Sequence, residues 1–317
     1  MGDSATVRSD VDFAAAGGVV LRGWLYLPAH RDGRVPGVVM AHGFSATKEM
    51  GLDRYAEVFA AAGLAVLVYD HRNLGASDGE PRQLINPWAQ ARDYRHALTW
   101  LADRPEVDAA RLALWGSSFS GGEVIVVGAL DERVRAVVAN VPFASLGAGD
   151  EPSPERLAAM GAALLDGSGS GPADSDEEPL GPLRVVSEPG VESTDPVFLG
   201  QPESTEWFLA QRELGGTRWE NRVLLRAFPG DPVRFDPSVC LPFLDPPLLM
   251  VVASEDRVAD TAATLAAYER AREPKQLELI EGHHFVPYDG DAFERAATLE
   301  RDFIVAVLSR DTEATHA

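Results

Sequence analysis

Residues Arg111–Gly122 read RLALWGSSFSGG, and the apolar run EVIVV follows them. The first half has the continuous apolar character of a buried strand, and the run after Gly122 is typical of a buried helix. A strand that turns sharply into a helix at a serine is the pattern of a nucleophile elbow, in which strained dihedrals lift the hydroxyl above the sheet edge. The segment therefore predicts Ser118 as a nucleophile.

The small residues around this serine follow the elbow pattern with one departure. Gly116 fills the small position two residues before Ser118, where strand and helix approach closely. Two residues after it, Ser120 stands where the pattern has glycine. The alternative interpretation is a glycine-rich turn without chemistry, so other residues must decide between the two.

Composition and charge narrow the classes of function. The chain has 317 residues, 45% of them hydrophobic, which suffices for one large core with or without an inserted subdomain. Its formal net charge of −21 argues against nucleic acid as a partner, because a polyanion would be repelled. Cys240 is the only cysteine, so the sequence predicts no internal disulfide and no cysteine-based metal site.

Targeting signals are not evident in the sequence. No apolar run reaches the length of a membrane span, and the first residues lack the basic and apolar pattern of a secretory signal. We therefore expect a cytoplasmic protein without a membrane partner.

Strands and helices are expected to alternate along most of the chain. Residues 19–28 resemble one strand of a leading antiparallel pair. Alternation of strands with helices predicts an α/β fold with a mostly parallel, doubly wound sheet. Besides the strand before Ser118, buried strands are expected at 38–41, 64–69 and 247–253 and further strands at 134–141 and 275–280, with helices at 55–63, 87–101, 261–272 and 293–308.

Residues 146–239 interrupt this alternation and are rich in proline, glycine and acidic residues. We interpret them as a cap inserted into a core formed by 1–145 and 240–317, with a merely decorative surface insertion as the alternative. Within the cap, Gly167–Glu178 is a Gly/Ser-rich acidic segment that we expect to be mobile. Helical patches are expected at 155–165 and 206–228, and the aromatic residues Trp207, Phe208, Trp219 and Phe228 need a surface to pack against.

The candidate acid and base follow the last two expected strands. Asp256 lies on the loop after 247–253, with Glu255 and Asp260 as near alternatives. Two adjacent histidines follow 275–280, of which we assign His284 as the base and give His283 a supporting role. The chain order serine, acid, histidine, with each residue at the carboxyl end of a strand, favours a catalytic triad over a glycine-rich turn without chemistry.

Backbone donors for a developing oxyanion are predicted from two loops. The strand at 38–41 ends in His42-Gly43-Phe44, a position where serine hydrolases place half of an oxyanion hole. The backbone amides of Phe44 and Phe119 would be the two donors. We expect His42 to brace this loop rather than transfer protons, and we expect Asp70 and Arg72 to pair and order the following polar loop.

These motifs together resemble the α/β-hydrolase superfamily, and within it the dienelactone-hydrolase-like and S15-peptidase-like branch that includes polyketide transferases and thiohydrolases. The resemblance covers both core segments and thins between about 146 and 200. It implies the α/β-hydrolase fold with an inserted cap, but it hardly constrains the substrate. It rests on HGF at 42–44, DHR at 70–72, GSSFSGG at 116–122, ASED at 253–256 and GHHF at 282–285.

The predicted function is that of a serine hydrolase that cleaves a carboxylic ester or thioester of a small acyl substrate through an acyl-enzyme on Ser118. Such chemistry needs neither a metal nor an organic cofactor. Trp207 and Trp219 of the cap are the candidate substrate-binding residues. An acyltransferase with the same acyl-enzyme, or a non-hydrolytic protein that keeps the fold, are the alternatives, and assembly into a homodimer is left open.

Overall fold

A computed structural model of the chain describes residues 5–147, 151–166, 178–192, 194–226 and 233–314. Most of the expected mobile segment, 167–177, lies outside these residues, as does Phe228. Among the helices of the described part, none is long and apolar enough to cross a membrane.

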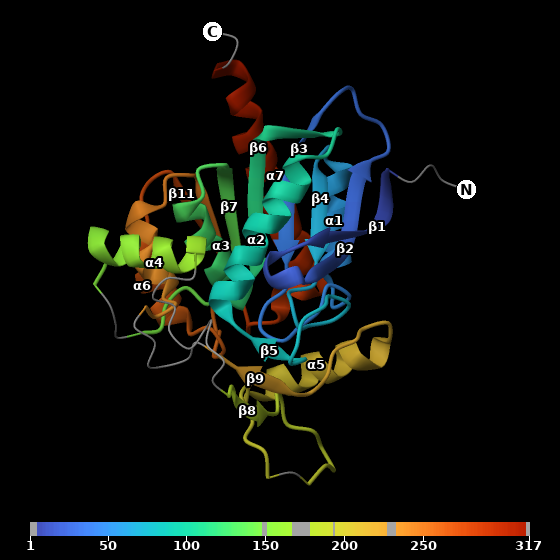
Figure 1. The fold of residues 1–317 in the computed structure, drawn as a ribbon, viewed down its shortest axis with the longest axis vertical. Helices are drawn as coiled ribbons and strands as arrows, with labels where there is room; N and C mark the ends of the chain where they lie inside the picture. The colour runs from blue at the N-terminus through green and yellow to red at the C-terminus, as the bar shows by residue number, and fades with distance from the viewer. Residues whose placement is uncertain (1–4, 148–150, 167–177, 193, 227–232, 315–317) are drawn as a thin grey trace.

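A twisted sheet of eight strands forms the centre of the molecule (Figure 1). The first two strands of the sheet are antiparallel to their neighbours, and the other six are parallel to one another. Val38–Ala41 are completely buried, as a strand covered on both faces requires. The order across the sheet is β1 (Thr6–Ala14), β2 (Val20–Pro28), β4 (Ala65–Tyr69), β3 (Val35–Ala41), β6 (Val107–Ser117), β7 (Val134–Asn140), β10 (Leu248–Ala253) and β11 (Lys275–Ile280).

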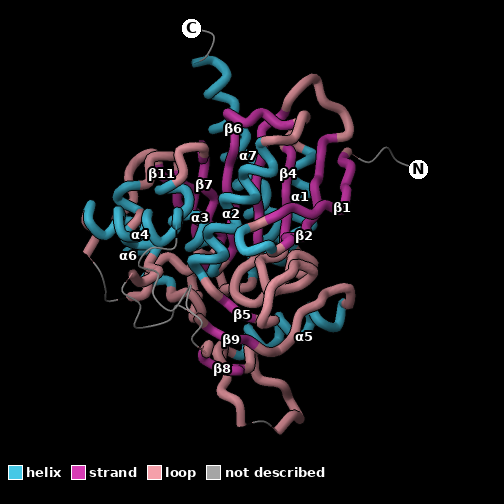
Figure 2. The backbone as a smooth tube through the Cα atoms, viewed as in Figure 1, coloured by secondary structure: helices cyan, strands magenta, loops and turns pink. Residues whose placement is uncertain are grey.

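Helices cover both faces of this sheet, as Figure 2 shows. On one face, α1 (Leu52–Ala61) and α7 (Gly290–Ala314) pack on β3, β4 and β6. On the other face lie α2 (Pro87–Ala102), α3 (Phe119–Leu130), α4 (Pro154–Asp166) and α6 (Thr261–Glu269). Asn86 accepts a hydrogen bond from the backbone N–H of Ala89, which caps the N-terminus of α2. The predicted doubly wound α/β arrangement is therefore present.

The insertion between β7 and β10 divides between two places. Its first helix, α4, packs on α2 and α3, with Met160, Ala163 and Leu164 in the same apolar cluster. Its middle part contributes α5 (Pro202–Leu214), β8 (Leu180–Leu183) and β9 (Val223–Leu225), which lie at one end of the large sheet, at the bottom of Figure 1. Within the described residues, short 3-10 helices lie at Ala16–Gly18, Pro237–Val239, Leu241–Phe243 and Val286–Tyr288.

The helix expected over 206–228 is wrong in its second half. Helix α5 ends at Leu214, because Gly215 and Gly216 adopt φ values of 81° and 83°. Strand β9 follows and joins a second sheet of order β5-β9-β8, in which β5 (Leu84–Ile85) comes from the segment before α2. Val223–Leu225 are apolar and fully or nearly fully buried, and Val223 is β-branched, so they suit a buried strand.

Candidate active site

Ser118 lies at a sharp turn between β6 and α3, with φ 55° and ψ −116°. A β-carbon on Gly116 would lie 2.2 Å from the backbone oxygen of Ser120, so only glycine fits where the strand meets the helix. The backbone N–H of Ser118 donates to the carbonyl of Asn140 on β7, at 2.9 Å. The positive φ of Ser118 is a strained backbone conformation, which the surrounding strands hold in place. Strain of this kind is found at functional sites.

Three side chains that are far apart in the sequence form a chain of hydrogen bonds. Ser118 Oγ lies 2.9 Å from His284 Nε2, and His284 Nδ1 lies 2.6 Å from Asp256 Oδ2. Both His284 and Asp256 are buried. A hydroxyl, an imidazole and a carboxylate in this order can pass the hydroxyl proton to the imidazole while the carboxylate fixes the ring.

The neighbouring candidates for the acid and the base have other positions. Glu255 is exposed, and Asp260 caps α6 by accepting from the backbone N–H of Ala263 at 2.9 Å. His283 is exposed, and its Nδ1 accepts from the backbone N–H of Phe285 at 3.2 Å. The structure therefore brings Asp256 and His284 to Ser118, rather than Glu255, Asp260 or His283.

The loop around Asp256 keeps its carboxylate ionised. Burial alone would raise the pKa of Asp256, but hydrogen bonds from His284 and from the backbone N–H groups of Ala259 and Val258 outweigh it and lower the pKa. Asp256 Oδ1 accepts both backbone bonds at 2.8 Å, which leaves Oδ2 for the imidazole. The carboxylate is thus anionic and held in one orientation.

The end of β3 approaches the turn at Ser118 closely. A β-carbon on Gly43 would lie 2.7 Å from Ser118 Cβ and 3.2 Å from the backbone nitrogen of Phe119. Phe44 follows Gly43, and its ring contacts the ring of Phe119 edge-on, with centroids 6.0 Å apart. The two segments expected to supply backbone donors therefore lie side by side at the nucleophile.

His42 braces this approach, in agreement with the structural role expected for it. Its Nε2 donates to the backbone oxygen of Met50 at 3.0 Å, and its Nδ1 accepts from the backbone N–H of Gly43 at 2.8 Å. Its ring stacks on Tyr288, with centroids 5.5 Å apart. Burial lowers the pKa of His42 to about 4, although the bond to Met50 acts in the opposite direction, so the ring is neutral near pH 7.

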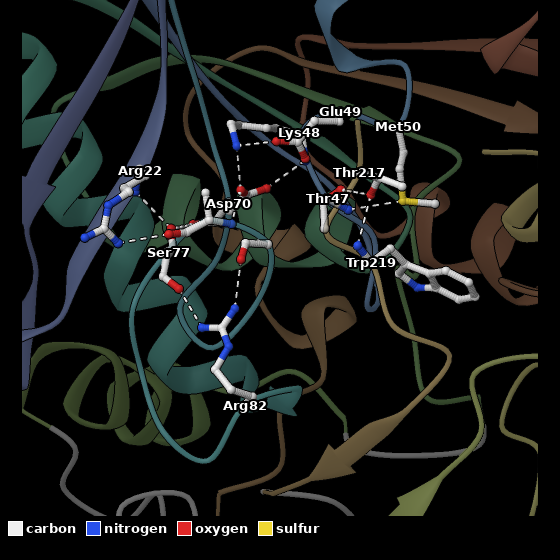
Figure 3. A network of polar contacts seen from close by, with 12 residues as sticks. Arg22, Thr47, Lys48, Glu49, Met50, Asp70, Ser77, Arg82, Thr217 and Trp219 are labelled. Atoms are coloured by element: carbon white, nitrogen blue, oxygen red, sulfur yellow. Dashed lines mark hydrogen bonds and ion pairs between the residues drawn. The ribbon is translucent and has the colours of Figure 1, made fainter. Parts of the chain in front are cut away.

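Figure 3 shows the polar network that fixes the loop after His42. Lys48 is buried, and its Nζ donates to Asp70 Oδ2 at 2.7 Å while its backbone N–H donates to Asp70 Oδ1 at 2.8 Å. Thr47 Oγ1 lies 2.8 Å from Thr217 Oγ1, which joins this loop to the insertion. The loop that carries Phe44 is therefore tied both to the end of β4 and to the segment after α5.

The expected ion pair between Asp70 and Arg72 is wrong. Arg72 instead makes two hydrogen bonds to Asp93 on α2, from Nε at 2.7 Å and from Nη2 at 2.5 Å. Asp70 also accepts from the backbone N–H of Ala76, so Lys48 and the backbone occupy its carboxylate. The loop is therefore ordered by two separate ion pairs, one between Asp70 and Lys48 and the other between Arg72 and Asp93.

A cavity of about 310 Å³, partly open to solvent, adjoins Ser118 and His284. Its wall is apolar and includes Phe44, Leu199, Trp207, Phe208, Val258 and Phe285. Leu199 and Val258 could not be recognised from the sequence, because both lie in irregular segments outside the helices and strands.

The two candidate tryptophans lie at different depths. Trp207 on α5 lines the cavity and stacks on Phe285, with centroids 4.9 Å apart. Trp219 lies behind the wall: its ring stacks on Phe208 at 5.1 Å, and its Nε1 donates to Ser45 Oγ at 3.1 Å. The structure thus places Trp207 where a substrate would bind and Trp219 where it supports Phe208, which corrects the direct contact expected for Trp219.

A metal centre is not formed by the described residues. None of their His, Cys, Asp and Glu side chains gather in groups of three or more that could hold a metal ion. The side chains that reach the cavity beside Ser118 are mostly apolar.

Comparisons with known proteins agree with this geometry. Residues 17–163 match the family described as X-Pro dipeptidyl-peptidase (S15 family). The chain is 32% identical over 287 residues to the quorum-quenching protein AidA of Acinetobacter baumannii, with 90% of each chain covered. It is also 32% identical over 310 residues to the thiohydrolase aneE of Aspergillus aculeatus, covering 95% of this chain and 94% of the relative.

A solved structure extends the likeness to three dimensions. The α/β hydrolase GrgF from Penicillium sp. sh18 has a TM-score of 0.71 and 30% identity to this chain, covering 96% of this chain and 99% of GrgF. The polyketide transferase grgF of Penicillium sp is 32% identical over 305 residues, which cover 95% of this chain and 97% of the relative. The predicted fold class is confirmed, and the chain belongs to the α/β-hydrolase family that includes the polyketide transferases and thiohydrolases.

Proposed function

We propose that this serine hydrolase cleaves carboxylic esters or thioesters with Ser118, His284 and Asp256 as its catalytic triad. The observation that carries the proposal is the hydrogen-bond chain from Ser118 Oγ through His284 to Asp256 beside an apolar cavity. His284 Nε2 takes the proton of Ser118 as Oγ attacks the acyl carbonyl, and the anionic Asp256 stabilises the imidazolium that forms.

Backbone N–H groups of Phe44 and Phe119 form the oxyanion hole in this proposal. Gly43 supports this assignment, because the absence of a side chain lets the end of β3 come close to Ser118 and to the backbone nitrogen of Phe119, which brings the two donors to one place. The tetrahedral intermediate places its negative oxygen there, expels the alcohol or thiol, and leaves an acyl-enzyme on Ser118. Water activated by His284 then releases the acid and restores the enzyme.

The insertion serves as a cap over the acyl group. Trp207 and Phe208 on α5, together with Phe285 from the core, give the cavity apolar walls. Burial of one methylene group is worth about 0.8 kcal/mol, so each carbon that fits should raise kcat/KM by up to about fourfold. We expect kcat/KM for p-nitrophenyl esters to rise from acetate to medium chains and then to fall when the cavity is full.

Active-site labelling and a chain-length series test this proposal together. A fluorophosphonate should form an adduct on Ser118, identified by peptide mapping, and Ser118→Ala should abolish both labelling and hydrolysis. An adduct on Ser117 or Ser120 would contradict the assignment of the nucleophile. A preference for acetate over every longer ester would contradict the apolar cavity as the acyl site.

Acyl transfer is the second candidate, because one close relative is named a polyketide transferase and another a thiohydrolase. Both reactions share the acyl-enzyme and differ in whether water or another nucleophile removes the acyl group. Product analysis with a medium-chain thioester and added alcohols distinguishes them: we expect free acid to dominate, and dominant ester formation at modest alcohol concentration would assign the protein as a transferase. The cytoplasmic location stays a prediction, which cell fractionation would test.

A further inference from the structure

Ser120, the residue that departs from the glycine of the elbow pattern, is completely buried directly behind the nucleophile. Its Oγ donates to the backbone oxygen of His42 at 2.6 Å. His42 is the last residue before Gly43 and Phe44, and Ser120 follows Phe119 directly. One side-chain hydrogen bond therefore connects the two segments that supply the proposed oxyanion donors. A glycine at this position could not make it.

Two neutral neighbours orient the Ser120 hydroxyl. His71 Nε2 lies 2.8 Å from Ser120 Oγ, and Glu123 Oε2 lies 2.9 Å from it. Burial lowers the pKa of His71 to about 3 and raises the pKa of Glu123 well above its usual value, which favours the neutral form of both side chains. Ser120 Oγ has a single proton, which it can donate to the His42 carbonyl at 2.6 Å or to Glu123 Oε2 at 2.9 Å. A neutral Glu123 can donate its own proton to Ser120 Oγ, as the N–H of His71 can, and this leaves the Ser120 proton for His42.

We propose that Ser120 is a positioning residue that fixes the distance between the Phe44 and Phe119 amides through its hydrogen bond to the His42 carbonyl. The inference rests on the proposed function, since it assigns Ser120 to the oxyanion hole of that reaction. The bond lies within two residues of each donor, so its loss lets the end of β3 move relative to α3. Other elbows have glycine at this position, whereas Ser120 is buried and has three polar neighbours. This arrangement supports a role for its hydroxyl beyond filling space.

The test compares Ser120→Ala and Ser120→Gly with the unmodified enzyme. Ser120→Gly restores the common elbow residue, so it keeps the turn accessible to folding. Ser238→Ala is the matched control, because Ser238 is also buried but its hydroxyl donates to Asp236 Oδ1 at 2.8 Å rather than to β3. For each variant, kcat and KM are measured with the preferred p-nitrophenyl ester, and Ki with a medium-chain alkyl trifluoromethyl ketone, whose adduct on Ser118 places an oxyanion in the hole.

We expect kcat to fall by about tenfold to a hundredfold in both Ser120 variants with little change in KM, since loss of a whole donor costs about a hundredfold to a thousandfold. The Ki of the ketone should rise by the same factor. Glu123→Gln retains a donor to Ser120 Oγ and should lose less than about fivefold in kcat. Ser238→Ala should keep kcat and Ki close to those of the unmodified enzyme.

Two results would overturn the role of Ser120: kcat within about twofold of the unmodified enzyme in Ser120→Gly, or a fall in kcat without a matching rise in the Ki of the ketone. Failure of the proposed function looks different. In that case the fluorophosphonate would leave Ser118 of the unmodified enzyme unlabelled, and the ketone would not bind at all.

Discussion

Substitution of Gly43 by alanine should disable catalysis while leaving the fold intact. The new β-carbon would lie 2.7 Å from Ser118 Cβ and 2.8 Å from the backbone oxygen of Ser117. Relief to an ordinary contact of at least 3.4 Å requires a displacement of about 0.7 Å between β3 and the elbow. Because misplacement by about 1 Å can cost about a hundredfold, we expect kcat to fall by at least about thirtyfold.

The assay is steady-state hydrolysis of p-nitrophenyl esters, with thermal unfolding followed by circular dichroism. Gly161→Ala is the matched control, since a β-carbon on Gly161 of α4 would make only an ordinary 3.6 Å contact with Leu130. The control should keep its activity and gain up to about 1 kcal/mol of stability from improved helix propensity. If Gly43→Ala kept kcat within about threefold of the unmodified enzyme, the close approach of β3 to the elbow would not matter for the reaction.

Three further changes test other parts of the site. Asp256→Asn should lower kcat by about ten-thousandfold, because the amide would favour the wrong imidazole tautomer, whereas Asp260→Asn should change kcat only a few-fold; the reverse order in steady-state assays would reassign the acid. Burial raises the pKa of Glu300 to about 8, so this acid lowers the stability of the folded state progressively as the pH rises from about 4.5 to about 8. In urea unfolding, Glu300→Gln should be more stable than the unmodified protein at pH 8 but not at pH 4. An equal effect of the substitution at both pH values would contradict a buried neutral acid. Arg257 pairs with Glu203 at the start of α5, so Arg257→Ala should raise KM by up to about fivefold with less change in kcat, and a fall in kcat alone would show that this ion pair does not position α5.

The elbow and the order of the three site residues were predictable because they depend on short patterns. The glycine, serine and apolar residues around Ser118 are contiguous, and the positive φ at Ser118 follows from that local sequence. Asp256 and His284 lie on the loops that follow strands β10 and β11. Carboxyl ends of parallel strands meet at one edge of a sheet, so these side chains were expected to converge.

Side-chain partners across the fold could not be predicted in the same way. Asp70 has Arg72 two residues away in sequence but Lys48 within 2.7 Å in space, because Lys48 returns on the loop after β3. Trp219 has the large apolar side chain expected of a substrate-binding residue. In the structure, however, its Nε1 donates to Ser45 and its ring stacks on Phe208. Such contacts depend on the relative placement of distant segments, which periodicity does not encode.

The small sheet has a consequence for protein engineering. Strand β5 at Leu84–Ile85 belongs to the segment that enters α2, while β9 and β8 belong to the insertion. Exchange of one continuous stretch of this chain is therefore not expected to transfer the substrate range of a relative. A graft of 180–225 from a relative would leave its central strand facing a foreign neighbour, so a working chimera should carry the matching 84–85 and the 45–47 loop that contacts Thr217 and Trp219.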